Sequence, residues 1–370
     1  MPHIISVDDE ETFLHFLAEG YIGVRLPQKY YDYIGKESLS KRKLDALLKT
    51  IYDIFADLKR VKVDDEIFIH VRGEQRIFGV FRANSPFLES PTIPNEFRSS
   101  NLLLEKLWGK KLPALSETDF IWQVSIKSDR DFYFDEGFDA NEVFRLKDLC
   151  KGIWTIPERW KYEDKEKTVR PLLPEEAEKL IVLLRESNPK GPSNSKVFPK
   201  DMSGFNRIEL PLVPVNGFVR DEKLMEAWIM ANAVKPEESD AYENIKNVFG
   251  DFSFVANTIR SFYIKFMDIF GYMKQDDCRI YKIIELKTSE ASPKDLDQLV
   301  KYVAWIAEFL CGNDLNKVYG FLCAKKFPKA VVELLNKYNS MKLKLVEYVA
   351  SNKRLTFKDF IPNSKLSTFL

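Results

Sequence analysis

The fold of the second half of this chain is decided by the stretch Tyr281-Lys-Ile-Ile-Glu285-Leu-Lys287-Thr288. Its adjacent isoleucines indicate a buried strand. Side chains alternate between the two faces of a strand, so Glu285 and Lys287 share one face and Leu286 points into the core. Placing two opposite charges on one face of a buried strand is costly unless both are satisfied. The stretch therefore predicts a strand that carries a functional site.

A second apolar stretch, Phe266-Met-Asp268-Ile-Phe270, places one carboxylate in another predicted strand. If the two strands pair, Asp268 and Glu285 lie side by side. Adjacent carboxylates are hard oxygen ligands that suit Mg²⁺ or Mn²⁺. Such an ion polarises a phosphate and lowers the pKa of a bound water, which Lys287 then orients or helps to deprotonate. These residues predict metal-dependent hydrolysis of a phosphodiester bond, with Asp268 and Glu285 as metal ligands.

Two predicted helices add polar side chains to this site. Gln298 and Tyr302 are four residues apart and share one helix face, where we expect contacts to the phosphate or to nearby waters. Glu226 is an acid within an otherwise apolar helix, and we expect it to reach the metal through a water. Each residue has a structural alternative: an ion pair for Glu285 and Lys287, a core position for Tyr302, and solvent exposure for Glu226. The order of these segments along the chain favours the catalytic interpretation.

In this order, residues 221–338 resemble the PD-(D/E)XK nuclease superfamily, and within it the NucS/EndoMS mismatch endonucleases. The motifs that carry the resemblance are Met267-Asp268-Ile269, Ile284-Glu285-Leu-Lys287-Thr288, Asp297-Gln298-Leu-Val-Lys301-Tyr302 and Val318-Tyr-Gly-Phe-Leu-Cys-Ala324. The resemblance implies a metal-dependent DNA endonuclease in which Asp268 and Glu285 bind the metal and Lys287 is the catalytic lysine. It gives supporting roles to Glu226, Gln298 and Tyr302. It does not extend to residues 1–215.

The end of the sequence, Asn363-Ser-Lys-Leu366-Ser-Thr-Phe369-Leu370, resembles the sliding-clamp-binding box Gln-x-x-aliphatic-x-x-aromatic-aromatic. NucS proteins also end in such a tail. The resemblance therefore implies a sliding clamp as a partner, bound through Asn363, Leu366, Phe369 and Leu370. Here Asn stands for the Gln and Leu for the last aromatic residue, which weakens the match. The alternative is an apolar tail that folds back onto its own domain.

The clearest break in the chain is at residues 188–207, which are rich in Pro, Gly, Ser and Asn. We expect a first domain over 1–190, a linker over 191–215, a nuclease domain over 216–352 and a tail over 353–370. In the nuclease domain we expect helices at 221–233, 293–310 and 328–338 and strands within 252–272 and at 279–287, 317–324 and 342–349. This alternation predicts an α/β fold with a mixed sheet flanked by helices.

The first domain has the pattern of an α+β fold. Its predicted elements are a helix over 39–60, a hairpin over 66–83, a strand over 120–126 and a helix over 174–187. This order resembles PUA-like domains of the EVE type, which read modified or flipped bases in an aromatic pocket. The resemblance implies a DNA-reading domain. The candidate stacking residues are Tyr21, Trp122, Trp154 and Trp160, and a position in the hydrophobic core is the alternative for each.

Composition bounds the choice of partners. Basic and acidic residues number 56 each, so nucleic acid must be bound by a local patch and not by a net field. The candidate phosphate contacts are Lys294, Lys301, Lys325, Lys326 and Lys329, with a solvated basic face as the alternative. The cysteines and histidines lack the spacing of a zinc site. We find no signal peptide and no apolar stretch that would span a membrane, and expect a cytoplasmic, nucleoid-associated protein.

Several functions stay open at this point. The first is a repair endonuclease that cuts mismatched or branched DNA and docks on the sliding clamp. The second is a modification-dependent restriction endonuclease whose first domain reads the modified base. A non-catalytic nucleic-acid-binding protein is disfavoured, because a buried charge cluster without a metal is costly. An RNA nuclease would act on the same phosphate group. Cutting both strands requires two active sites, so we expect a homodimer.

Overall fold

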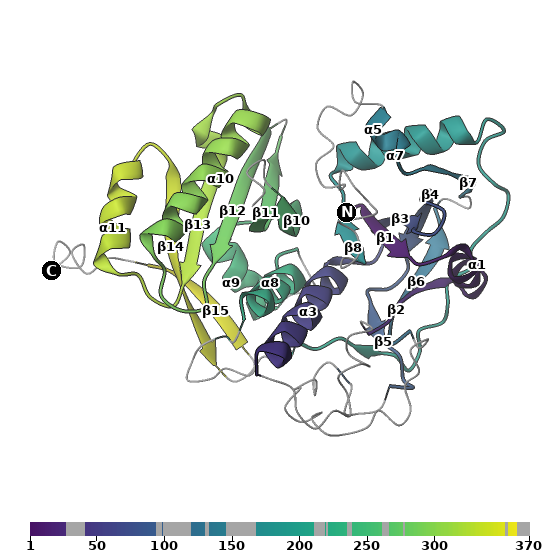
Figure 1. Ribbon diagram of the computed structural model, residues 1–370, viewed down its shortest axis with the longest axis horizontal. Coiled ribbons are helices and arrows are strands. Elements are labelled where there is room, and N and C mark those ends of the chain that lie inside the picture. Colours follow the sequence, from purple (N-terminus) through teal and green to yellow (C-terminus); the bar gives the residue numbers. More distant parts are fainter. Residues whose placement is uncertain are drawn as a thin grey trace. The chain divides into compact units, whose positions relative to one another are not determined.

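The computed structural model divides into two compact units, Met1–Pro211 and Leu212–Leu370 (Figure 1). It describes residues 1–26, 41–93, 98, 120–129, 133–145, 168–210, 219, 221–234, 239–260, 266–276, 278–351 and 354–360. The division between the units falls inside the stretch expected to be the linker. None of the helices within these ranges is long and apolar enough to cross a membrane.

The first unit is built on one mixed sheet. Its strands are β1 (His3–Val7), β2 (Tyr21–Val24), β3 (Glu66–Val71), β4 (Arg76–Ala83), β5 (Leu88–Glu89), β6 (Trp122–Ser128), β7 (Phe134–Asp139), β8 (Val169–Pro171) and β9 (Asn206–Arg207). The strand order is β8-β1-β3-β4-β6-β5-β9, with β2 paired to β6 and β7 paired to β4. β1 and β3 run parallel, whereas β3 and β4 form the predicted antiparallel hairpin.

The helices of the first unit are α1 (Glu10–Glu19), α3 (Lys41–Arg60), α5 (Glu142–Arg145) and α7 (Pro174–Ser187). The sequence predicted α3 and α7, and both are confirmed. Pro174 begins α7 because the first turn of a helix does not need its missing N–H. Leu180 and Leu184 of α7 then pack against Phe68 and Phe138 of the sheet, in the core of this unit.

The linker was expected over 191–215, and its first part, residues 191–210, belongs to the first unit. These residues pack along that unit as an extended strap. The backbone N–H of Ser193 donates to the Tyr133 carbonyl, and the N–H of Val197 donates to the hydroxyl of Ser128. Further on, β9 pairs with β5. A composition rich in Pro, Gly and Ser excludes helices, but it leaves backbone groups able to bond to neighbouring strands.

Two of the candidate stacking residues belong to the core of the first unit. Trp122 is fully buried and its ring meets that of Phe55 edge to face at 5.4 Å. Tyr21 is 5% exposed and packs against the ring of Phe16. The core alternative therefore holds for both residues. Trp154 and Trp160 lie outside the described residues.

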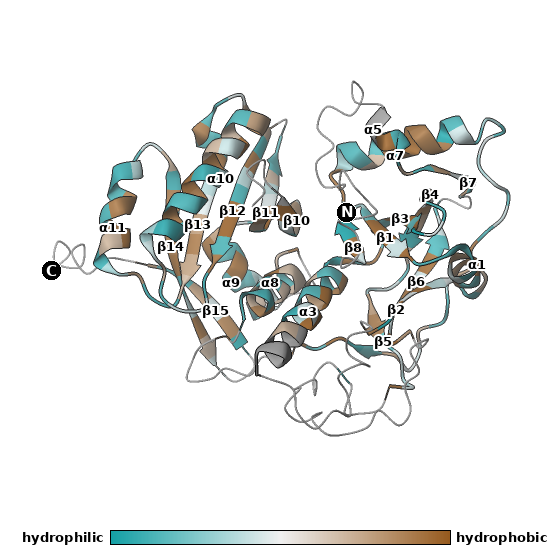
Figure 2. Cartoon of the chain, viewed as in Figure 1, coloured by the Kyte–Doolittle hydropathy of each residue, from teal (hydrophilic) through white to brown (hydrophobic). Residues whose placement is uncertain are grey.

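The second unit contains a six-stranded mixed sheet. Its strands are β10 (Phe254–Arg260), β11 (Phe266–Gln275), β12 (Cys278–Leu286), β13 (Val318–Ala324), β14 (Lys342–Ser351) and β15 (Arg354–Asp359). They lie in the order of the chain. The central strands β12, β13 and β14 run parallel, and the remaining neighbours run antiparallel. Figure 2 shows hydrophobic residues along these strands and polar residues on the outer sides of the helices.

Helices cover both faces of this sheet, as predicted. They are α8 (Glu222–Asn232), α9 (Asp240–Phe249), α10 (Pro293–Cys311) and α11 (Lys329–Leu335), with short 3₁₀ turns at Leu315–Lys317 and Asn336–Tyr338. Gly320 of β13 faces α10, since a Cβ there would lie 2.8 Å from a Val303 methyl. The next residue, Phe321, points to the other face, where its ring lies 5.2 Å from Phe249 of α9. The mixed α/β class is therefore confirmed for this unit.

The expected tail over 353–370 is wrong in its first part. Residues Arg354–Asp359 form β15, which pairs antiparallel with β14. Leu355 and Phe357 alternate with polar residues and are buried, and Phe357 packs on the ring of Phe249. The period-two pattern of a strand is present there, but it covers only a few residues. The clamp-box residues Asn363, Leu366, Phe369 and Leu370 lie outside the described residues.

Candidate active site

Pairing of β11 with β12 brings two carboxylates together. Ile269 lies opposite Ile284, and the same register places Asp268 opposite Glu285. The backbone N–H of Leu286 donates to an Asp268 carboxylate oxygen at 2.8 Å. The two strands thus pair, which is the condition under which the sequence predicts that Asp268 and Glu285 lie side by side. Side chains two residues apart along a strand share a face, and the residues two positions from each acid lie on the face that α10 covers. Both acids therefore point to that face.

Glu285 is the most buried group of this cluster. Its side chain is 2% exposed, and Oε1 accepts hydrogen bonds from Lys287 Nζ at 2.9 Å and from Gln298 Nε2 at 3.0 Å. The other oxygen, Oε2, is buried and has no hydrogen-bond partner among the described residues. Burial, and after it the negative charge of Asp268, raises the pKa of Glu285 to about 8. Lys287 alone therefore does not offset the burial of Glu285 and the negative charge of Asp268.

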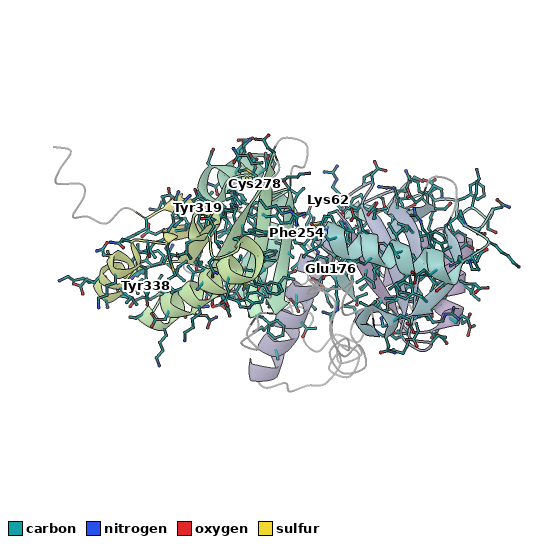
Figure 3. All side chains as sticks on the ribbon, turned by 90° about the horizontal axis from the view of Figure 1, so that it is seen from above. Lys62, Glu176, Phe254, Cys278, Tyr319 and Tyr338 are labelled. Atoms are coloured by element: carbon teal, nitrogen blue, oxygen red, sulfur yellow. The ribbon has the colours of Figure 1, made fainter. Side chains whose placement is uncertain are left out.

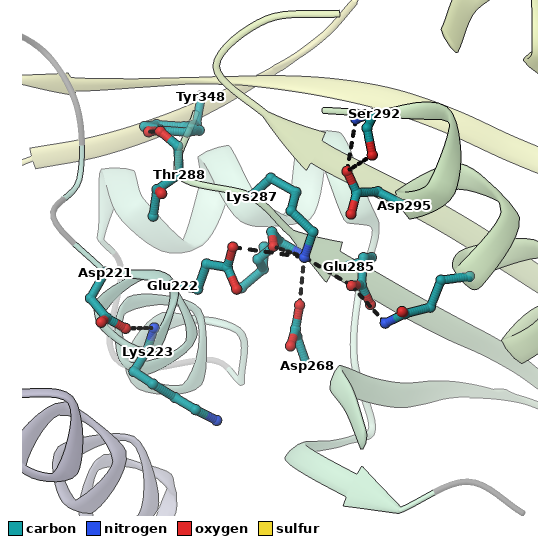
Figure 4. A network of polar contacts seen from close by, with 12 residues as sticks. Asp221, Glu222, Lys223, Asp268, Glu285, Lys287, Thr288, Ser292, Asp295 and Tyr348 are labelled. Carbon is teal, nitrogen blue, oxygen red and sulfur yellow. Dashed lines mark hydrogen bonds and ion pairs between the residues drawn. The ribbon is translucent and has the colours of Figure 1, made fainter. Parts of the chain in front are cut away.

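Lys287 supplies the positive charge of the site (Figure 4). Its Nζ donates to Glu285 and to the Leu286 carbonyl, at 2.9 and 2.7 Å, and lies 3.7 Å from Glu222 Oε1. Burial lowers the pKa of Lys287, but the charges of Glu285, Asp268 and Glu222 together raise it by more. The net pKa lies above the ordinary value, so Lys287 is an ammonium group in this arrangement.

The structure places Glu226 of α8 beside strand β10. Glu226 is fully buried, and its Oε2 accepts from Lys223 Nζ at 2.9 Å, Asn257 Nδ2 at 3.2 Å and the Thr258 hydroxyl at 3.3 Å. Glu226 therefore occupies a polar cluster between α8 and β10.

The acid of α8 that approaches Lys287 is Glu222, one helical turn before Glu226. Sequence reasoning missed it, because an acid at the first position of a helix is explained equally well by the helix dipole. The available signal was the four-residue spacing, which places Glu222 and Glu226 on neighbouring turns. Only the packing of α8 determines which of the two acids reaches the site.

Helix α10 brings Gln298 and Tyr302 to the sheet. It begins at a capping box, in which the Ser292 N–H donates to Asp295 Oδ2 at 2.7 Å and Pro293 opens the first turn. Gln298 contacts Glu285 directly. Tyr302 is 1% exposed, and its hydroxyl donates to the Phe266 carbonyl at 3.0 Å. Burial and the nearby carboxylates raise the pKa of Tyr302, so it stays a neutral hydroxyl that joins α10 to the start of β11.

The two carboxylates fit a divalent metal ion of the Mg²⁺ type. No group of three or more His, Cys, Asp or Glu side chains suited to a metal occurs within the described part of the chain. Mg²⁺, however, is commonly held by one or two carboxylates and keeps several waters. Asp268 and Glu285 form such a pair of hard oxygen donors, and the buried Glu285 Oε2 accepts no hydrogen bond from the residues that the structure describes.

The candidate phosphate-contacting lysines lie on α10, in the segment after β13 and at the start of α11, where Lys329 is exposed. Lys294 and Lys301 are exposed on α10. Lys325 and Lys326 follow β13, and the Lys325 N–H donates to the Ser289 carbonyl. β12 and β13 are parallel, so their carboxyl ends share one edge of the sheet. Lys325 and Lys326 therefore lie at the same edge of the sheet as the carboxylates.

Comparison of the chain with protein-family models and with curated proteins finds no match. Two carboxylates lie opposite each other on paired strands, a charged lysine bridges two acids, and an amide from α10 holds one carboxylate oxygen. This set of groups can bind a divalent cation and stabilise negative charge beside it.

Proposed function

We propose that this protein is a divalent-metal-dependent endonuclease that hydrolyses phosphodiester bonds in DNA. The observation that carries the proposal is the pairing of Asp268 with Glu285, whose Oε2 is buried without a partner among the described residues, beside the Lys287 ammonium. A resident Mg²⁺ or Mn²⁺ would be held by Asp268 and Glu285.

When bound, the metal supplies a polarised phosphate and a water of lowered pKa. The protein supplies the fixed charges around it. Lys287 is held as an ammonium and is therefore suited to stabilise negative charge that develops on the phosphate. Gln298 donates to Glu285 Oε1, so the other oxygen, Oε2, would be the one that binds the metal. Tyr302 maintains the distance between α10 and β11. Glu222 forms a second ion pair with Lys287.

Within this function we favour cleavage of mismatched or branched DNA in repair, with docking to a sliding clamp through the residues after 360. A modification-dependent restriction endonuclease is the second candidate, and one observation favours it. The first unit contains a cavity of about 530 Å³ whose wall includes Val80, Phe134 and Arg82. Pockets of this size and mixed polarity accommodate small ligands such as a base.

The test is cleavage of a panel of labelled substrates with Mg²⁺ or Mn²⁺, and with a chelator as control. The panel contains plain, mismatched, branched and single-stranded DNA, duplexes with modified cytosines, and the matching RNA duplex. Selective cutting of mismatched or branched DNA supports the repair role, and selective cutting of modified duplex supports restriction. Binding without metal-dependent cutting of any substrate would contradict the enzyme proposal and indicate a non-catalytic binding protein.

A further inference from the structure

The hydroxyl of Tyr348 joins two segments of the chain that meet at the candidate active site. Tyr348 lies on β14 and is 1% exposed. Its hydroxyl donates to the Thr288 carbonyl (Figure 4) and accepts from the Val219 N–H at 3.4 Å. A phenol can donate one hydrogen bond and also accept, so a single oxygen serves both segments. Burial raises the pKa of Tyr348 to about 12, which keeps the hydroxyl protonated near neutral pH.

The two segments carry the two members of one ion pair. Thr288 directly follows Lys287, which comes just after the end of β12 at Leu286. Val219 lies three residues before Glu222, the first residue of α8. Lys287 Nζ and Glu222 Oε1 are 3.7 Å apart. The Tyr348 hydroxyl therefore links the backbones from which the two charged side chains extend.

Both segments lie outside the regular pairing of the sheet. The pairing of β12 with β13 ends at Leu286, and Thr288 lies two residues beyond it. The N-cap of α8, Asp221, accepts from the Lys223 N–H at 2.8 Å, a contact that stays within the helix. A lysine has a long and flexible stem, so the position of its ammonium depends on where its backbone is held. The Tyr348 hydroxyl ties each segment to β14.

We propose that Tyr348 is a positioning residue for the cleavage reaction, an inference that rests on the proposed function. Its hydroxyl holds the backbones of Lys287 and Glu222 at a fixed separation, so that the Lys287 ammonium keeps its place beside Glu285. Electrostatic stabilisation of a transition state requires charges that are already in place, and a small displacement of such a charge slows the reaction. Tyr348 thus acts through the ion pair and not on the phosphate itself.

The experiment compares single-turnover cleavage by the full chain at saturating DNA and Mn²⁺ for the wild type, Tyr348→Phe and a matched control. Phenylalanine retains the ring and removes only the hydroxyl. The control is Tyr319→Phe on β13, whose hydroxyl accepts from Lys342 Nζ at 3.3 Å (Tyr319 is labelled in Figure 3). Tyr319 lies near the beginning of its strand, whereas the candidate site lies at the carboxyl ends. Urea unfolding of each variant shows whether it is folded.

Tyr348→Phe should slow the cleavage step by about tenfold. The affinity for DNA in chelator should stay at the wild-type value, and the control should cleave at the wild-type rate. A folded Tyr348→Phe that cleaves like the control would overturn the inference. Weaker DNA binding with an unchanged rate at saturation would also overturn it, because the residue would then serve binding and not the cleavage step.

A double-mutant cycle tests whether Tyr348 acts through the ion pair. Residues that act together give non-additive effects. Tyr348→Phe should therefore slow cleavage by a smaller factor in a Glu222→Gln background than in the wild type. An equal factor in both backgrounds would show that the hydroxyl does not act through Glu222, which contradicts the inference.

Hydrogen exchange tests the contact without cleavage. The Val219 amide should exchange more slowly in the wild type than in an open peptide, and faster in Tyr348→Phe than in the control. Exchange of this amide at the open-peptide rate in the wild type would overturn the inference, whether or not the variant folds. If exchange behaves as expected but the wild type cuts no substrate, the contact stands and the nuclease proposal fails.

Discussion

At the scale of single residues, the site is defined by one buried carboxylate and the charges around it. Glu285 is nearly inaccessible, and Lys287 donates to it while also lying near Glu222. The arrangement keeps Lys287 protonated. The proposed catalytic role of this lysine is therefore stabilisation of charge, and the activation of water is left to the metal ion.

Replacement of Asp268 or Lys287 tests these roles. We expect Asp268→Asn and Lys287→Ala each to lower the cleavage rate by a factor on the order of 10² to 10³, the usual effect of removing one charge-stabilising group. DNA binding in chelator should change little. Single-turnover cleavage and anisotropy measure the two properties. Lys344→Ala, at an exposed lysine of β14, is the control, and wild-type rates in either test variant would refute the site assignment.

Glu222 and Glu226 should differ in the property that each supports. Glu222→Gln removes a charge beside Lys287, and we expect slower cleavage with an unchanged free energy of unfolding. Glu226→Ala removes the carboxylate that accepts from Lys223 and the buried Asn257, and loss of such buried hydrogen bonds costs about 1 to 3 kcal/mol. Urea unfolding and cleavage assays on both variants separate the effects. The reverse pattern would show that Glu226, and not Glu222, serves the site.

At the scale of elements, α10 and β11–β12 determine the geometry together. The helix contacts the sheet through Gly320, where a Cβ would approach Leu343 Cδ2 to 2.7 Å and Val303 Cγ2 to 2.8 Å. The absence of a side chain at this position lets the helix lie close to β13. That close approach brings Gln298 within hydrogen-bond distance of Glu285.

Gly320→Ala should therefore affect both stability and activity. The added methyl must displace the stiff Val303 side chain or the helix itself, and overpacking of this kind costs about 1 to 3 kcal/mol. A displaced α10 would also lengthen the contact of Gln298 with Glu285 and slow cleavage. Chemical unfolding and cleavage rates test this. An unchanged stability would mean that the helix lies farther from β13 than the structure places it.

Local patterns predicted the elements well where they were long. The helices α3, α7, α8 and α10 and the strands β12 and β13 follow from apolar periodicity, because each buries one clear face. The strand β15 was missed, since its few alternating residues resemble a tail. Strand β1 was also missed, because its pairing with the distant β3 is a long-range contact that a single stretch of sequence does not reveal.

At the scale of the whole molecule, buried charge also makes stability depend on pH. His3 is fully buried in the first unit, and its Nε2 lies 2.8 Å from Asp65 Oδ2. Burial lowers the pKa of His3 from 6.5 to about 4, although the Asp65 interaction opposes the shift. The unfolded chain binds a proton in this interval and the folded chain does not. Stability from His3 is thus present above pH 6.5 and lost as the pH falls toward 4.

Acidification from pH 6.5 to 4 should cost roughly 3 kcal/mol through His3 alone, at about 1.4 kcal/mol for each pKa unit. Thermal unfolding of the full chain over this interval should show the loss, and His3→Gln should make the loss smaller. His15→Gln, at an exposed histidine, is the control. If the two variants respond to pH in the same way, His3 does not carry the effect.

The sequence by itself determined the properties that depend on short spacing. Glu285 and Lys287 share a face because strands have a period of two, and Gln298 and Tyr302 share a face because helices have a period near four. The tertiary structure decided the rest. The register of β11 against β12 places Asp268 opposite Glu285, and the packing of α8 brings Glu222 to Lys287. These contacts join residues far apart in the chain, so their geometry arises only when the sheet and its helices pack together.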